Sequence, residues 1–167
     1  MSTATSYLAA NLRLSIGYGE KLAADIPAEK FTFKPHPTMN HPAWCFGHLS
    51  VYPDRLFVNA FGRPDLAKTN EQFEKLFAAG TECLADPKAY PSKEEIMAHF
   101  VGRYKAMAEY LPSVTDATLE EVNPNEKMRE RMPKKGNAVF FLCANHIMMH
   151  LGQVSSWRRA AGLPGVM

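Results

Sequence analysis

The sequence contains few cysteines, and none of them is placed in a paired-thiol motif. The chain of 167 residues has three, Cys45, Cys83 and Cys143, and none belongs to a CxxC pair. An odd number of unpaired cysteines argues against a disulfide framework and is typical of a reducing compartment. The opening segment MSTATSYLAANLRLS also lacks the basic start and apolar core of a secretory signal. We therefore expect a cytoplasmic protein with free thiols.

Long hydrophobic runs and an excess of charge of one sign are absent as well. No apolar run approaches the roughly 18 residues that a membrane helix needs. The net charge is only +2, and the basic residues are scattered along the chain. The densest basic segment, residues 127–135 (KMRERMPKK), includes an acidic residue, so we interpret it as a solvated loop. These features predict no nucleic-acid partner and no membrane partner.

Strand signals are almost absent, whereas four long segments have the apolar periodicity of helices. They cover approximately residues 3–24, 40–61, 92–111 and 137–161. A long crossover between the second and third segments carries one short helix at about 71–79. Four long helices without a sheet predict an all-α fold, a four-helix bundle that forms a single domain over residues 1–167.

Local signals mark the ends of these helices and one interruption. Asn40 and Asn70 are predicted N-caps, and Ser92 with Glu95 has the spacing of a capping box. Pro53 lies inside the second helix and predicts a kink there. Gly162 is predicted to end the last helix.

Two histidines in the last helix, His146 and His150, are four residues apart and therefore share one face. Side chains at that spacing can bind one metal ion, but Ile147 stands where a zincin protease has its glutamate. His48, in an apolar part of the second helix, is the best candidate for a third ligand. Three neutral imidazoles from two helices would leave coordination positions open, as in catalytic sites. The alternative is that all three are hydrogen-bonded residues of the core.

The other histidines have simpler interpretations. His41, seven residues before His48, is predicted to be solvated at a helix N-terminus, although it could line the mouth of a pocket. His36 lies between two prolines in a loop. His99 is four residues from both Glu95 and Arg103, a spacing that predicts a surface ladder of ion pairs.

Four further side chains near the candidate ligands have open roles. Cys45 and Cys143 each lie three residues before a candidate histidine, so a mixed cysteine–histidine site is possible, but we favour small buried core residues. Gln153 could orient a ligand or bond across the bundle. Arg158 is favoured by the dipole at the helix C-terminus, and binding of an anionic substrate is its alternative.

The segments AWCFGHL and HIMMHLGQVSSWRRAAGLP resemble the DinB-like (DinB/YfiT-like) superfamily. The resemblance rests on the tryptophan and histidine of the second helix and on the closing pattern H-x-x-x-H-x-G-Q … R … G-x-P. It implies a four-helix bundle with a long crossover after the second helix. It also implies a divalent metal, typically nickel or zinc, held by His48, His146 and His150. Some members use a low-molecular-weight thiol (bacillithiol, mycothiol or glutathione), and members often form homodimers.

The leading hypothesis is a metal-dependent enzyme that acts on a small molecule as a thiol-dependent S-transferase or a hydrolase. The alternative is a non-catalytic bundle that binds metal or a ligand in a stress response or in sensing. Free space and a polar group beside the histidines would favour the enzyme, whereas a packed, dry trio would favour the alternative.

Overall fold

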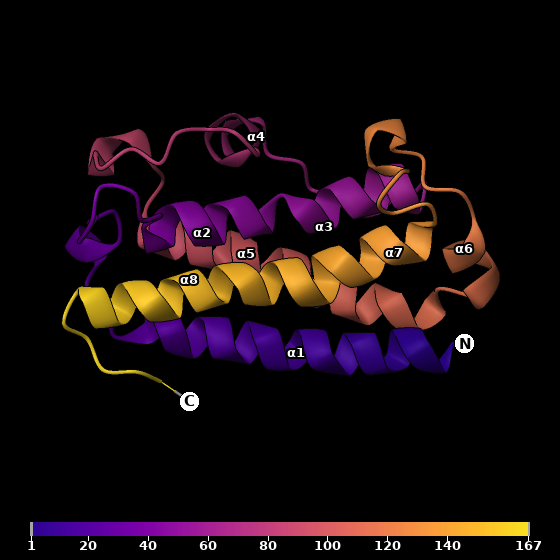
Figure 1. The fold of residues 1–167 in the computed structure, drawn as a ribbon, viewed down its shortest axis with the longest axis horizontal. Coiled ribbons are helices and arrows are strands. Elements are labelled where there is room, and N and C mark those ends of the chain that lie inside the picture. The colour runs from indigo at the N-terminus through magenta and orange to yellow at the C-terminus, as the bar shows by residue number, and fades with distance from the viewer. Residues whose placement is uncertain (1, 167) are drawn as a thin grey trace.

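The computed structural model describes residues 2–166, so Met1 and Met167 at the ends of the predicted domain lie outside the described residues. The described chain consists of helices joined by turns and loops (Figure 1). Within it, the only strand-like pairing is one isolated antiparallel bridge between Val122 and Lys134. The α-helices are α1 (Thr3–Ala24), α2 (Pro42–Ser50), α3 (Tyr52–Arg55), α4 (Glu71–Phe77), α5 (Lys93–Tyr110), α6 (Asp116–Glu120), α7 (Lys135–Phe140) and α8 (Ile147–Ala160).

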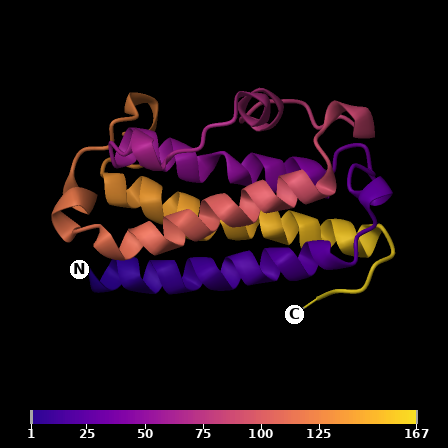
Figure 2. The ribbon, with the colours of Figure 1, turned by 180° about the vertical axis from the view of Figure 1, so that it is seen from behind.

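Four long helical rows run side by side in the two opposite views of Figures 1 and 2. Two of them are the single helices α1 and α5. The other two are composite: α2 continues through α3 into a π-helical turn at Leu56–Ala60, and α7 continues through a π-helical turn at Phe141–His146 into α8. α1 packs against α5 and α8, and α2 packs against the same two helices. The predicted all-α fold is confirmed, and this packing is compatible with the predicted four-helix bundle.

Both composite rows contain interruptions, of which the sequence predicts only the kink at Pro53. The second row is interrupted at Val51, between α2 and α3. Pro53 has no backbone N–H to donate to the carbonyl of Leu49, which explains the predicted loosening at this point. The two π-helical turns have no signal in the apolar periodicity. Such turns recur at functional sites, and one of them ends at His146.

The predicted caps are confirmed with one exception. Ser92 and Glu95 form the capping box of α5, and the side chain of Asn70 caps α4. Gly162 follows the last helix with a φ of 79°. The exception is α2, whose N-cap is His41 rather than Asn40: the Nδ1 of His41 accepts a hydrogen bond of 3.1 Å from the backbone N–H of Trp44.

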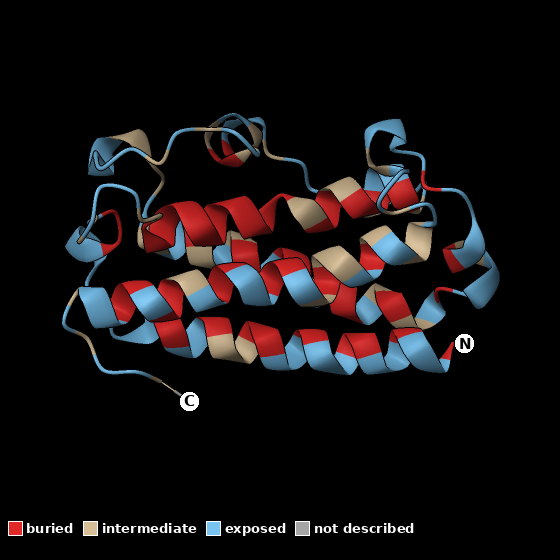
Figure 3. Cartoon of the chain, in the orientation of Figure 1, coloured by how far each residue is buried: buried red, intermediate tan, exposed pale blue. Residues whose placement is uncertain are grey.

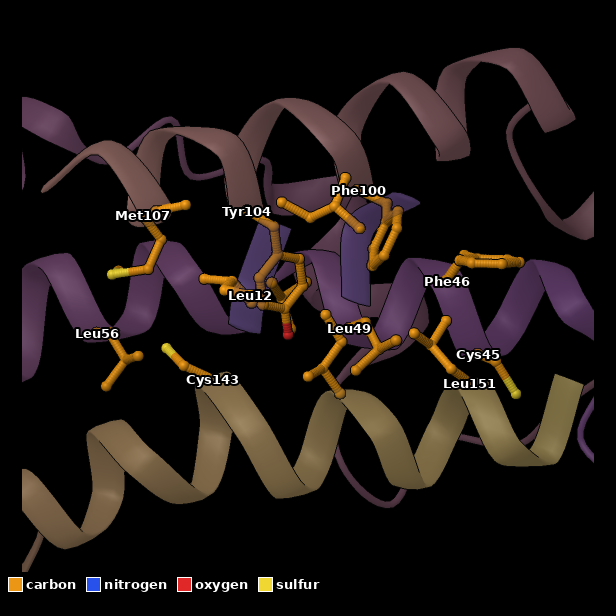
Figure 4. Close-up of a cluster of buried hydrophobic side chains, with 14 of the residues drawn as sticks. Leu12, Cys45, Phe46, Leu49, Leu56, Phe100, Tyr104, Met107, Cys143 and Leu151 are labelled. Atoms are coloured by element: carbon orange, nitrogen blue, oxygen red, sulfur yellow. The ribbon is translucent and has the colours of Figure 1, made fainter. Parts of the chain in front are cut away.

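The core lies between the four rows, and the buried faces of the helices turn toward it (Figure 3). Cys45 and Cys143 are both buried free thiols, as predicted, and Cys143 points into an apolar cluster with Leu56 and Met107 (Figure 4). Every residue of α2 is buried, because the crossover covers the side of α2 that faces away from the bundle. None of the described helices combines the length and the hydropathy that crossing a lipid bilayer requires.

The predicted surface ladder on α5 is wrong. Arg103 is buried, and its Nε donates to the Oδ1 of Asp54 at 2.6 Å while its Nη2 donates to the carbonyl of Leu66 at 2.7 Å. His99 stacks on Phe73 with ring centroids 4.3 Å apart. A buried carboxylate on α3 is a stronger partner for the arginine than an exposed residue on its own helix.

Arg158 is also fully buried, so it is not available to a substrate. Its Nη2 donates to the Oδ2 of Asp25 at 2.9 Å, and its Nη1 donates to the carbonyl of Leu22 at 2.7 Å. Its Nη2 further donates to the carbonyl of Pro164 at 3.0 Å. The arginine therefore ties the end of α1 to the segment that follows α8, a tertiary role that the helix dipole does not predict.

Close contact between α4 and α2 depends on Gly47. A Cβ at this position would lie 2.4 Å from a ring carbon of Phe77, whose side chain is fully buried and cannot move aside. We expect Gly47→Ala to destabilise the fold by about 1–3 kcal/mol through overpacking. The measurement is urea unfolding, compared with the wild type.

The matched control is Gly17→Ala in α1, where no atom lies within 4 Å of the added Cβ. That change is expected to stabilise the protein by about 0.5–1 kcal/mol, since alanine is a better helix former than glycine. Equal effects of the two substitutions would show that the contact between Gly47 and Phe77 is not tight.

Candidate metal centre

The structure brings together the three histidines that the sequence selects as ligands. His48 comes from α2, His146 ends the π-helical turn, and His150 lies one turn later in α8. One nitrogen from each ring can be chosen so that all three lie within 4.8 Å of one another. The ring centroids are 4.7 to 5.2 Å apart, and all three residues are buried. Their spacing is small enough for one ion to contact all three.

Hydrogen bonds fix the orientation of two of the rings. The Nδ1 of His48 lies 2.7 Å from the carbonyl oxygen of Phe77, and the Nδ1 of His150 lies 3.1 Å from the Oε1 of Gln153. Both oxygens can only accept, so each Nδ1 carries a proton and each Nε2 keeps its lone pair, which in His48 accepts a hydrogen bond of 3.3 Å from the hydroxyl of Tyr52. This is the arrangement found behind metal-binding histidines, in which the distal N–H is held by an acceptor.

The third ring, that of His146, has an unsatisfied nitrogen. Its Nδ1 is buried and has no hydrogen-bond partner among the described residues. A buried polar atom without a partner costs roughly 1–3 kcal/mol. The three imidazoles, with one nitrogen from each within 4.8 Å of the others, are a donor set that nickel and zinc both accept. The side chains present therefore fit such an ion.

Burial keeps the three imidazoles neutral. Desolvation lowers the pKa of His48 to about 4 and that of His146 to about 3, and it also lowers the pKa of His150. The neighbouring rings of the trio reinforce the lowering for His48 and His146. Only the neutral ring has a lone pair to offer, so the environment prepares all three side chains to be ligands near neutral pH.

Two aromatic side chains complete the surroundings of the trio. Trp44 stacks on His48 with centroids 4.5 Å apart, and its Nε1 donates to Thr81 at 3.1 Å. The hydroxyl of Tyr52 lies 3.3 Å from the Nε2 of His48, and the Tyr52 ring lies 4.5 Å from that of His146. The sequence analysis missed Tyr52 as a site residue, although its position four residues after His48 places both on one face.

A cavity of about 580 Å³ adjoins the trio at His146 and Tyr52. One wall comes from α3 and the turn after it, another from α7 and the π-helical turn before α8, and a third from the loop between α6 and α7. The predicted solvated loop at 127–135 is therefore only partly correct, because Met128 and Met132 line the cavity. The lining residues are Tyr52, Arg55, Leu56, Asn59, Ala60, Ala79, Asn123, Pro124, Asn125, Met128, Met132, Ala138, Phe141, Leu142 and His146.

Several predictions about neighbouring residues can be compared with the structure. Gln153 orients His150, in line with the first of its two predicted roles, and its Oε1 also accepts from Asn40 at 3.4 Å. The predicted solvation of His41 is wrong, since its buried ring donates from Nε2 to the carbonyl of Leu84 at 2.8 Å. His36 is exposed and bonds only to Thr38 nearby.

No cysteine belongs to the cluster of potential ligands among the described residues.

A family model described as the DinB superfamily matches residues 14–154, a span that contains all three histidines. The chain belongs to the DinB superfamily. No curated protein and no solved structure matches it. For this DinB superfamily member the resemblance read from the sequence is confirmed, and a three-histidine cluster makes it a protein that could bind a metal.

The lowered pKa values predict that the metal-free protein is sensitive to acid. Below about pH 6.5 an unfolded chain takes up protons on its histidines, whereas the buried imidazoles stay neutral until about pH 4 or below. Stability is therefore present above pH 6.5 and is lost as the pH falls toward 4. For His146 we expect a loss of about 1–2 kcal/mol between pH 8 and pH 5.

Urea unfolding of metal-stripped protein at both pH values measures this loss. His146→Leu should show a smaller difference between pH 8 and pH 5 than the wild type, while His36→Leu, at an exposed site, should leave the difference unchanged. An unaltered difference in His146→Leu would mean that His146 is not held neutral by the fold.

Proposed function

We propose that this protein is a metal-dependent enzyme in which His48, His146 and His150 hold a divalent ion, nickel or zinc. The substrate is a small organic molecule that enters the adjoining cavity. The reaction is the transfer of a low-molecular-weight thiol to an electrophile or, as the second candidate, a hydrolysis.

The observation that carries this proposal is the junction of the histidine trio with the cavity. His146 and Tyr52 belong to both, so free space and a hydroxyl group lie beside the candidate ligands. A bundle that only stored an ion or held its core together would not need such space. The junction therefore supports an enzyme over the non-catalytic alternative.

An ion held by His48, His146 and His150 would lower the pKa of a bound thiol or water and so would supply a nucleophile near neutral pH. The chain's own residues supply orientation and exclusion of water. Phe77 and Gln153 hold the distal nitrogens of two ligands, and Trp44 covers one face of the His48 ring. The hydroxyl of Tyr52 bonds to the Nε2 of His48, and it would turn to a substrate in the cavity once an ion held that nitrogen.

Thiol transfer is favoured over hydrolysis by the resemblance noted from the sequence. No aspartate or glutamate is among the described residues that line the cavity, so this lining offers no carboxylate as general base for a hydrolysis. A thiol whose pKa was lowered in this way would be deprotonated near neutral pH and would need no general base from the protein. The thiol itself, a homodimer, a single domain, a cytoplasmic location and the lack of nucleic-acid and membrane partners stay predictions.

The first test is the metal content of protein purified without a nickel column. We expect about one nickel or zinc per chain in the wild type and its loss in His146→Ala, because two imidazoles hold an ion far less tightly than three. Elemental analysis gives both values, and circular dichroism checks that the variant remains helical.

His36→Ala is the matched control, since His36 is an exposed histidine outside the cluster. It should retain the metal content of the wild type. If the wild type takes up no ion even after titration with nickel and zinc, the histidines are buried polar contacts and the proposal fails.

A second prediction concerns the hydroxyl of Tyr52. Tyr52→Phe keeps the ring against His146 but removes the hydroxyl that bonds to the Nε2 of His48 beside the cavity. We expect unchanged metal content with a kcat about 100- to 1000-fold lower in a thiol-transfer assay, the range for a lost hydrogen-bond donor beside the reacting group. A kcat equal to that of the wild type would exclude Tyr52 from the reaction.

A further inference from the structure

Arg55 is the only side chain with a full charge among the described residues that line the cavity. It is half-buried and forms a two-pronged ion pair with Glu74 of α4, through Nε at 3.1 Å and Nη2 at 2.5 Å. Its Nη1 takes no part in this ion pair. The guanidinium thus keeps one edge free of Glu74, on which the neighbouring polar group is the hydroxyl of Tyr52, and its Cζ lies 5.2 Å from the centre of the Tyr52 ring.

The remaining walls of the cavity are mostly apolar. Phe141 and Leu142 come from the π-helical turn, and Met128 and Met132 face them from the loop. Methionine adapts to irregular shapes, and its sulfur makes favourable contacts with aromatic rings. Asn123 holds the loop in place, since its Nδ2 donates to the carbonyl of Met132 at 2.9 Å.

We propose that the cavity selects an organic monoanion with an apolar, aromatic body, bound with its anionic group on the free edge of Arg55 and its body between Met128, Met132 and Phe141. This inference rests on the proposed function, in which the same cavity holds the substrate.

The charge distribution gives the physical reason for this choice. A carboxylate or sulfonate on Nη1 would gain charge-assisted hydrogen bonds in a partly buried place, where they are about twice as strong as neutral ones. Glu74 does not oppose it strongly, because its own charge is compensated by the same guanidinium. A cationic ligand would face Arg55 without any acidic group of the lining to balance it. The cavity therefore selects a ligand by the charge of its polar group and accepts apolar groups of different shapes.

The test uses three probes that share a naphthalene ring and differ in the charge of their polar group: 2-naphthoate, 2-naphthalenemethanol and 2-naphthylmethylammonium. Isothermal titration calorimetry with metal-loaded protein measures each affinity. We expect 2-naphthoate to bind about tenfold more tightly than the neutral alcohol, as one charge-assisted contact implies. The ammonium probe should bind more weakly than the alcohol.

Arg55→Met and Arg63→Met form a matched pair of variants. Arg63 makes a similar two-pronged ion pair, with Asp65, but does not line the cavity. Arg55→Met should abolish the preference for 2-naphthoate over the alcohol and leave the affinity for the alcohol within about twofold, whereas Arg63→Met should behave as the wild type.

Glu74→Gln is a control for the possibility that Arg55→Met misfolds. It releases Arg55 from its ionic partner, so 2-naphthoate should bind more tightly than to the wild type, an effect that loss of structure cannot produce. Equal affinities of the wild type for the three probes, or a preference that survives Arg55→Met, would overturn the inference.

The metal content of each sample separates this inference from the proposed function. If the samples hold nickel or zinc but bind the three probes equally, the metal site stands and the cavity does not select anions. If the samples hold no metal but still prefer 2-naphthoate, and Arg55→Met removes that preference, the cavity selects anions and the metal-dependent reaction is excluded.

Discussion

The structure depends on one electrostatic constraint: three buried imidazole rings lie so close together that none of them can readily carry a charge. A neutral ring must still satisfy two nitrogens, one as a donor and one as an acceptor. Two of the rings place their donors on Phe77 and Gln153, and their acceptors remain directed into the common space. The third ring has a buried nitrogen that nothing in the described chain satisfies. A cluster of this kind costs stability when empty, and a positive ion at its centre would relieve that cost.

The surrounding fold holds the cluster in place through contacts that are distant in sequence. The crossover reaches over α2 so that the carbonyl of Phe77 meets His48, and this approach requires the absence of a side chain at Gly47. The π-helical turn that ends at His146 forms one wall of the cavity together with α7. Packing around the ligands and access to them therefore come from the same two irregular segments.

The sequence predicts the helices and the histidine trio because both follow from regular spacing. His146 and His150 are one turn apart, and His48 lies in a segment too apolar for an unassisted imidazole. The capping box at Ser92 follows from local rules in the same way. Tyr52 was missed although its spacing from His48 points to it, whereas Arg55, Met128 and Arg103 depend on contacts between distant segments. Periodicity also cannot reveal a π-helical turn, since a single extra residue in one turn leaves little trace in the apolar pattern.

The two hydrogen bonds behind the ligands differ in how they can tolerate change during evolution. His48 is held by a backbone carbonyl, which every amino acid at position 77 would supply as long as the chain keeps its path. His150 is held by a side-chain amide, which few residues at position 153 could replace. The sequence of the crossover, and the surface that it forms around the site, can therefore diverge. The orientation of His48 is kept as long as the backbone of the crossover keeps its path. One half of the centre is encoded by residue identity and the other by the shape of the backbone.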